Sequence, residues 1–68
     1  MKRRMPKKGD IWRDFRGPFL VLDEHELSRW DAANDYVCQI TVVDMESGVR
    51  TDRWTVSRGM WEELVLVG

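Results

Sequence analysis

Cysteine, histidine and long apolar runs are scarce in this sequence of 68 residues. Cys38 is the single cysteine, which excludes an internal disulfide, and His25 is the single histidine. Without a second histidine or a cysteine pair, the chain lacks a ligand set for a zinc site built from nitrogen and sulfur donors. No apolar run reaches the roughly 18 residues that a membrane-spanning helix needs. We therefore expect a cytoplasmic protein with no metal, no cofactor and no membrane contact.

Groupings that perform catalysis are missing as well. The five glycines stand singly, so no glycine-rich loop is present to cradle a phosphate. His25 lies between two glutamates without a motif that supplies a nucleophile, and we expect it to face solvent in a loop. Cys38 alternates with apolar neighbours, and we expect its burial to raise the thiol pKa and make the thiol unreactive. The chain is therefore predicted not to be an enzyme.

Charge is distributed unevenly along the chain. The first eight residues carry five basic side chains, namely Lys2, Arg3, Arg4, Lys7 and Lys8. From Gly9 onward there are six basic and twelve acidic residues, a net charge of −6. Because no apolar segment of about 7 to 15 residues follows the basic start, we do not expect a cleaved signal peptide. The pattern predicts a flexible basic tail over residues 1–8 and one ordered domain over residues 9–68.

Alternation of apolar and polar residues indicates short strands rather than long helices. Residues 36–45 show the alternation best. Their predicted inner face consists of Tyr36, Cys38, Ile40 and Val42. Gln39 and Thr41 then belong to the opposite, polar face. Two further strands, residues 11–14 and 19–23, are expected on either side of a turn made by Gly17 and Pro18.

The second half of the chain predicts a hairpin and a final strand. Gly48 marks the hairpin loop at a positive φ angle, and residues 49–57 return with Trp54 and Val56 pointing inward. We expect truncation of Trp54 to cost more stability than truncation of any other aromatic residue. Residues 57–61 are expected to form one 3₁₀ turn before the last strand, residues 62–67. The segment near residues 25–33 fits either a short helix or an irregular loop.

Five short strands with a 3₁₀ turn before the last one predict an all-β fold, and this pattern resembles an SH3-like small five-stranded, partly open β-barrel. Residues 8–12 (KGDIW) and 18–22 (PFLVL) are similar to the start of KOW-type modules, Tudor-like modules and PemK-like toxins. The first two resemblances imply a binding module, whereas the third implies an RNA-cleaving enzyme or a gyrase poison. In PemK-like toxins the residue before the proline is typically arginine, but here it is Gly17. Arg16 is one position away, and one step in a strand turns a side chain to the other face.

Aromatic and arginine residues suggest a surface for a protein partner. At least one of Trp12 and Trp30 is expected to be partly exposed, and exposed aromatic rings beside arginines are typical of interface hot spots. The predicted binding residues are Trp12, Arg13, Phe15, Arg16, Phe19 and Trp30. In this interpretation the loop with Trp30 lies across a groove from residues 13–18. The first hypothesis is a non-enzymatic protein-interaction module of the kind found among small bacterial or phage regulators and inhibitors.

Two other functions stay open at this point. Nucleic-acid binding of the KOW or Tudor-like type would use the basic tail and the barrel loops, and its affinity would fall steeply with salt. Its predicted contact residues are Lys2, Arg3, Arg4, Lys7, Lys8, Arg50, Arg53 and Arg58. An endoribonuclease of the toxin kind is the third hypothesis. Homo-oligomerisation, through an edge strand or an exposed tryptophan, is also undecided.

Overall fold

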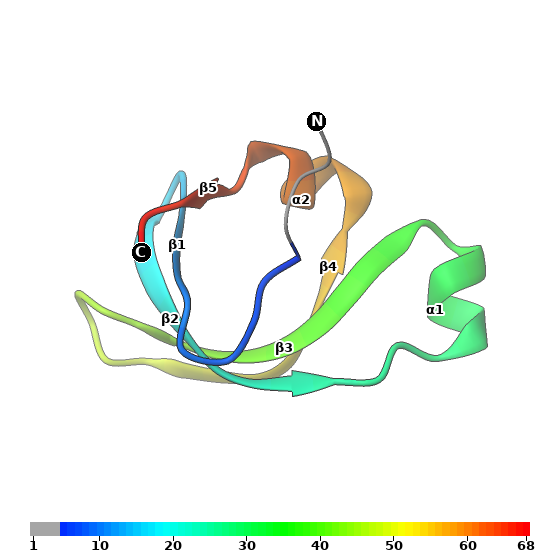
Figure 1. Cartoon of the computed structure of the whole chain (residues 1–68), viewed down its shortest axis with the longest axis horizontal. Coiled ribbons are helices and arrows are strands. Elements are labelled where there is room, and N and C mark those ends of the chain that lie inside the picture. The colour runs from blue at the N-terminus through cyan, green and yellow to red at the C-terminus, as the bar shows by residue number, and fades with distance from the viewer. Residues whose placement is uncertain (1–4) are drawn as a thin grey trace.

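The computed structural model describes residues 5–68, which form one antiparallel sheet of five strands with two short helices (Figure 1). In chain order the elements are β1 (Ile11–Asp14), β2 (Gly17–His25), α1 (Arg29–Ala33), β3 (Tyr36–Asp44), β4 (Arg50–Ser57), α2 (Arg58–Glu63) and β5 (Val65–Leu66). In space the order is β4-β3-β2-β1-β5, so the last strand returns to pair with the first. Within these residues neither helix has the length and apolar character needed to cross a membrane.

The sheet curls on itself (Figure 1), and its inner face holds a small core. Three irregularities in strand pairing help it to curl. One lies between Val21 and Asp23 of β2, and two lie in the pairing of β3 with β4, between Tyr36 and Cys38 and between Ile40 and Val42. The core side chains come from four strands and from the residue after α2. They are Trp12, Phe19, Val21, Ile40, Val42, Val56 and Leu64. The alternation predicted the inward direction of Ile40, Val42 and Val56.

A tight turn before β1 orients the first tryptophan. Asp10 donates its backbone N–H to the Lys7 carbonyl at 2.9 Å, and Gly9 between them has φ +91°, a conformation that glycine adopts without strain. The buried Asp10 carboxylate accepts hydrogen bonds from the Lys7 backbone N–H at 2.9 Å and from the Trp12 indole Nε1–H at 3.3 Å. The turn therefore supplies the polar partner that allows a tryptophan to be fully buried.

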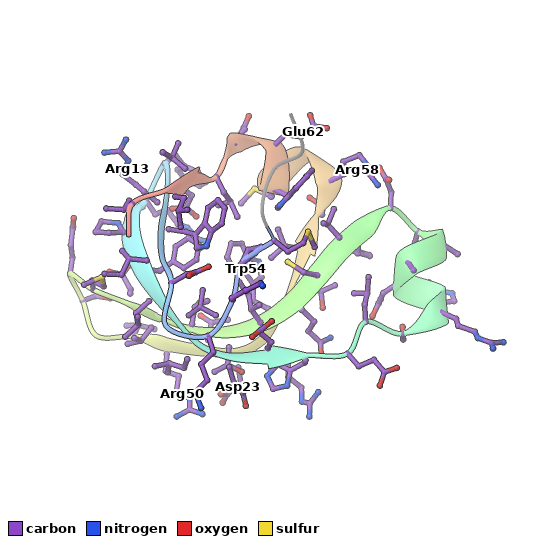
Figure 2. The ribbon with its side chains drawn as sticks, viewed as in Figure 1. Arg13, Asp23, Arg50, Trp54, Arg58 and Glu62 are labelled. Carbon is purple, nitrogen blue, oxygen red and sulfur yellow. The ribbon has the colours of Figure 1, made fainter. Side chains whose placement is uncertain are left out.

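This arrangement corrects the predicted roles of two tryptophans. Trp12 is only 2% exposed, so it belongs to the core and not to the surface. Trp54 points inward as predicted, but it is half-buried and packs at the border of the core (Figure 2). The reason is that Trp12 has its own buried hydrogen-bond partner, whereas Trp54 lies beside an open pocket. We therefore expect truncation of Trp12, and not of Trp54, to lower the stability of the domain most among the aromatic residues.

The first hairpin turn is also displaced from its predicted place. Phe15 and Arg16 form the turn, while Gly17 and Pro18 already belong to β2. Gly17 has φ +123°, a backbone conformation in which any residue with a side chain would be strained. The glycine therefore begins β2 with a positive φ angle and does not form the predicted turn.

Both helices depend on a serine at the N-cap. Ser28 caps α1 by accepting a hydrogen bond from the Asp31 N–H at 3.1 Å, which resolves residues 25–33 into a strand end and a short helix. Ser57 caps α2 in the same way through the Met60 N–H at 3.3 Å. A six-residue α-helix therefore replaces the predicted 3₁₀ turn. It takes up Glu62 and Glu63, so the last strand is only two residues long.

A polar network lies on the outer side of the sheet and corrects one further expectation. Thr41 lies on the face opposite to Ile40 and Val42, as predicted, but it is buried, and its Oγ1 accepts a hydrogen bond from the Arg53 backbone N–H at 3.3 Å. His25 is the half-buried last residue of β2, not a loop residue, and its Nε2 lies 2.7 Å from the same Thr41 Oγ1. Arg53 has φ +50°, so β4 bulges at this point and brings its backbone over Thr41. The simple alternation fails where the strand bulges.

Trp12→Ala is expected to be the most destabilising aromatic truncation. Emptying a buried aromatic site costs about 3 to 5 kcal/mol, much of the 5 to 15 kcal/mol typical of a whole domain. The matched control is Trp30→Ala, because Trp30 is 69% exposed and its truncation should change the free energy of unfolding by no more than about 0.5 kcal/mol. Urea denaturation followed by circular dichroism measures both. A Trp12→Ala variant as stable as the control would contradict the burial of this ring.

Asp10→Ala tests the polar partner of that ring. The substitution leaves the buried Trp12 indole N–H without this acceptor, which should lower the free energy of unfolding by about 1 to 3 kcal/mol. In the background of Trp12→Phe, where no indole donor exists, Asp10→Ala should cost less. A double-mutant cycle in denaturant gives the difference, with the exposed Glu26→Ala as a control. Equal costs in both backgrounds would show that the indole hydrogen bond contributes nothing.

Candidate functional site

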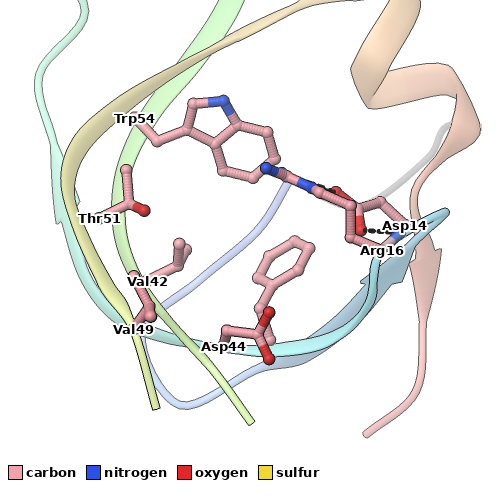
Figure 3. Close-up of a pocket in the computed structure, with 8 residues that line it drawn as sticks. Asp14, Arg16, Val42, Asp44, Val49, Thr51 and Trp54 are labelled. Atoms are coloured by element: carbon pink, nitrogen blue, oxygen red, sulfur yellow. Dashed lines mark hydrogen bonds and ion pairs between the residues drawn. The ribbon is translucent and has the colours of Figure 1, made fainter. Parts of the chain in front are cut away.

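A pocket of about 110 Å³ lies between the turn that joins β1 to β2 and the loop that joins β3 to β4 (Figure 3). Its floor is apolar and its rim is charged. The residues around it are Asp14, Arg16, Phe19, Val42, Asp44, Val49, Thr51 and Trp54. Cross-strand pairing brings them together, because Phe19 pairs with Asp44, and Val42 pairs with Thr51. Two hairpins far apart in the sequence thus make one concave surface.

Arg16 lies over the mouth of this pocket in a fixed position. Its Nη2 and Nε donate to Asp14 Oδ2 at 2.9 and 3.2 Å, and its backbone N–H donates to Asp14 Oδ1 at 2.9 Å. The guanidinium carbon is 5.6 Å from the ring centres of both Phe15 and Trp54, within reach of a cation–π interaction. Figure 3 shows Arg16 beside the Trp54 ring. The Asp14 side chain is 3% exposed and that of Arg16 is 58% exposed. The buried Asp14 carboxylate therefore holds the Arg16 guanidinium in place, while more than half of the arginine side chain stays exposed to solvent.

The aromatic part of the site consists of three rings in different environments. Phe19 is buried and meets Trp54 edge to face, with ring centres 5.5 Å apart and planes at 82°. This geometry is favourable for an aromatic pair and fixes the Trp54 ring as a wall of the pocket. Phe15 is 82% exposed at the turn and projects beyond the sheet. The site thus presents one exposed ring, one half-buried ring and a guanidinium between them.

The opposite rim is a loop held by Asp44. Its Oδ1 accepts from the backbone N–H groups of Glu46 at 2.8 Å and Ser47 at 3.1 Å. These two hydrogen bonds favour the charged carboxylate and lower the pKa of Asp44 below its ordinary 3.8. At a pH above 3.8 the charged Asp44 carboxylate therefore stabilises the folded loop. This stabilisation is lost as the pH falls through the lowered pKa of Asp44. Glu46 also approaches the first hairpin, since a Cβ on Gly17 would lie 3.1 Å from Glu46 Oε1.

The six residues predicted to bind a protein partner do not form one surface. Trp12 and Phe19 lie in the core. Arg13, Phe15 and Arg16 are exposed together at the first hairpin. Trp30 is exposed, but α1 lies at the opposite end of the long axis from that hairpin, so the two do not face each other across a groove (Figure 1). The nine residues of β2 separate them. Sequence reasoning missed Asp44, Val49 and Thr51, which only the strand register places at the pocket.

The residues predicted to bind nucleic acid are scattered. Lys2, Arg3 and Arg4 lie outside the described residues, while Lys7 and Lys8 are exposed before β1. Arg50 Nε donates to Asp52 at 2.8 Å, and Arg58 Nε donates to Asp35 at 2.9 Å. Arg50 begins β4 and Arg58 begins α2, and the two lie far apart in Figure 2. Arg50 and Arg58 therefore do not belong to one positive patch.

Chemistry outside the pocket is limited in the part of the chain that the structure describes. From residue 5 to residue 68, no three side chains of histidine, cysteine, aspartate or glutamate converge in a way that could hold a metal ion. Cys38 is half-buried on β3 and packs against the core. Burial raises the pKa of its thiol from 9.0 to about 11. This agrees with the expectation of a structural cysteine.

Cys38 is accordingly expected to react slowly with thiol reagents. With a pKa of about 11, roughly one thiol in a thousand is ionised at pH 8, and the thiolate is the reactive form. Absorbance after addition of a chromogenic disulfide at pH 8 gives the rate, and the same protein unfolded in guanidinium is the control. The folded protein should react at least tenfold more slowly. Equal rates would show that the thiol is accessible and ordinarily acidic.

Comparison with known proteins does not supply a function for this site. No family model matches the chain, and no curated protein and no solved structure is significantly similar to it. The resemblance to KOW-type, Tudor-like and PemK-like proteins therefore rests on residues 8–22 alone. What the site does is inferred below from its own geometry.

Proposed function

We propose that this chain is a non-enzymatic protein-interaction module and that it binds its partner at the pocket between the two hairpins. The observation that carries the proposal is the stack of Phe15, Arg16 and Trp54 over that pocket. Phe15 is 82% exposed and lies beside the Arg16 guanidinium at this pocket. Aromatic and arginine side chains are the residue types that dominate binding energy at protein interfaces.

The held position of Arg16 favours binding. An arginine that is free in solution loses side-chain entropy when a partner immobilises it, at a cost of about 0.5 to 1.5 kcal/mol. Arg16 is already oriented by Asp14 and by two rings, so much of that cost is met in the free protein. Its remaining N–H groups are available to a carbonyl or a carboxylate of the partner. The pocket beneath suits one small aliphatic side chain of the same partner segment.

The proposed fold is an SH3-like, partly open barrel. Support comes from the strand order, in which β1 to β4 follow one another and β5 returns to β1 after a short helix. Strand irregularities in β2 and opposite β3 add the curvature that such a barrel needs. A regulator or inhibitor that acts by binding would need no more than this scaffold and its loops. Fold alone does not determine function, so the proposal depends on the hairpin site.

The alternative of nucleic-acid binding has less support. Arg50 and Arg58 have acidic partners within 2.9 Å, and the residues after position 8 carry a net charge of −6. A polyanion would therefore depend on Lys7, Lys8 and the residues before them. This alternative is retained as an outcome of the experiment.

The test is selection of binding peptides from a random display library on the immobilised full-length chain, followed by titration calorimetry. Phe15→Ala should weaken the selected peptide at least tenfold, because truncation of a hot-spot residue costs about 2 kcal/mol or more. Its exposed side chain can be removed without opening the core. Trp30 is an aromatic residue that is 69% exposed on α1, at the far end of the molecule, and Trp30→Ala should change the affinity by less than twofold.

Two outcomes would overturn the proposal. One is loss of affinity in Trp30→Ala with none in Phe15→Ala, which would place binding at α1. The other is failure to select any peptide while a gel shift at low salt detects RNA or DNA binding that falls steeply with added salt. Intact RNA after incubation with excess protein is expected in either case, and cleavage would point to the toxin-like hypothesis.

A further inference from the structure

The pocket between the two hairpins carries more negative than positive charge. Asp14 and Asp44 line it together with one positive residue, Arg16, a net charge of −1. The Arg16 guanidinium lies 2.9 Å from the Asp14 carboxylate, so these two groups largely neutralise each other. The charge that is left over is that of Asp44, on the opposite rim. A partner that complements this pocket therefore brings a positive charge to Asp44.

Asp44 can bind a cationic group and keep its role in the loop. Its Oδ1 accepts from the backbone N–H groups of Glu46 at 2.8 Å and Ser47 at 3.1 Å. A carboxylate offers about four acceptor positions, so these two bonds do not use all of them. Besides these bonds, which act most strongly, the Arg16 charge also lowers the pKa of Asp44. The two side chains are therefore close enough to act on each other across the opening of the pocket.

Arg16 offers a different contact at the same opening. Its Nε and Nη2 donate to Asp14 Oδ2, which leaves Nη1 to donate to another acceptor. The floor of the pocket, made by Phe19 and Val42, is apolar. Figure 3 shows Asp44, Arg16 and Val42 on different sides of the pocket. The site thus combines an anionic acceptor, a cationic donor and a place for an aliphatic group.

We propose that this pocket binds the free N-terminal residue of a partner polypeptide, and that this residue carries a small aliphatic side chain. The inference rests on the proposed function and names the part of the partner that the site recognises. The ammonium group of the partner donates to Asp44, and its first carbonyl accepts from Arg16. Its side chain lies on Phe19 and Val42. These three groups branch from a single Cα, so one residue can reach all three sides of a small pocket.

Other parts of a polypeptide complement the site less well. A C-terminal carboxylate could accept from Arg16, but it would add a negative charge close to Asp44. An internal residue offers Asp44 only a neutral N–H, which is a weaker donor to a carboxylate than an ammonium group. A lysine side chain brings an ammonium group but has no acceptor for Arg16. Of these four, the N-terminal residue alone supplies a charged donor, an acceptor and an aliphatic group together.

L-Valinamide is a small probe that carries all three groups. Titration into the isotope-labelled full-length chain, followed by NMR, should shift the amides of Asp44, Glu46 and Ser47. These shifts should saturate with a dissociation constant in the millimolar range, as expected for a ligand of this size. Absence of a saturable shift at these amides would overturn the proposal.

Three matched probes serve as controls for L-valinamide. N-acetyl-L-valinamide lacks the ammonium group, and N-acetyl-L-valine carries a carboxylate instead. Both should bind at least tenfold more weakly than L-valinamide. D-Valinamide has the same groups in the mirror arrangement and should bind at least threefold more weakly. Equal affinity of any of the three would contradict the proposed contacts.

Asp44→Asn tests the ammonium site in the protein. The substitution removes the charge but keeps an oxygen that can accept from the Glu46 and Ser47 N–H groups, so we expect the loop to persist. It should weaken binding of L-valinamide at least tenfold. Glu26→Gln removes the same charge at an exposed position and should change the affinity by less than twofold. Equal weakening by the two variants would refute the assignment to Asp44.

Peptides selected on the immobilised chain separate this inference from the proposed function. N-acetylation of a selected peptide should weaken its binding at least tenfold. If the acetylated peptide binds as tightly as the free one and Phe15→Ala still weakens it, the inference is refuted and the proposed function stands. If neither form depends on Phe15, the pocket between the hairpins is not the binding site, and both are refuted.

Discussion

The hydrogen bond from the Trp12 indole to the Asp10 carboxylate is the contact on which closure of the sheet depends. β1 is the strand that pairs with both β2 and β5, and Trp12 is its one residue buried at the centre of the core. A buried indole N–H without an acceptor would be costly, and a buried carboxylate without donors more so. The Asp10 carboxylate accepts the hydrogen bond of the Trp12 indole, so each buried polar group has the other as a partner only two positions away. The remaining core, mostly β-branched and aromatic, packs around a ring whose position is already determined.

The two sides of the pocket, namely the turn between β1 and β2 and the loop between β3 and β4, are stabilised by the same type of hydrogen bond. Asp14 ends β1 and accepts from the N–H of Arg16, and Asp44 ends β3 and accepts from the N–H of Glu46. An aspartate that bonds a backbone N–H two residues later rigidifies the turn that follows it. The site therefore lies between two short, ordered turns and not between long loops. This gives a small domain a preorganised surface without a large core beneath it.

Periodicity predicted the longer strands better than it predicted the last strand or the site. Alternation in residues 36–44 follows directly from the pleat, so the inward direction of Ile40 and Val42 was predictable. Alternation placed Thr41 on the polar face but could not predict its burial, which depends on the bulge opposite it. Trp12 was misplaced because its partner, Asp10, becomes buried only through the turn at Gly9.

The helix and the pocket illustrate two other limits of the sequence. Gly59 disfavours a helix, but the Ser57 cap and the packing of Trp61 against the core stabilise α2. Helix propensities alone do not show either contribution. The pocket joins residues that are adjacent only through strand register. Phe15 and Arg16 were identified because composition alone marks an aromatic beside an arginine. Val49 and Thr51 carry no such mark, and only their place opposite β3 brings them to the site.

The return of β5 to β1 has a consequence for how the chain folds. Trp12 and Leu66 are neighbours in the sheet but are separated by more than fifty positions in the chain. The hairpins of β1 with β2 and of β3 with β4 need only short loop closures, so they can form early. Loop-closure entropy grows with the number of intervening residues, and pairing of β5 bears the largest such cost in the described sheet. During synthesis β1 can pair with β5 only after the residues up to Leu66 have been made. Until then one side of β1 is open to any other extended segment, and the rate of this last step sets how long that exposure lasts.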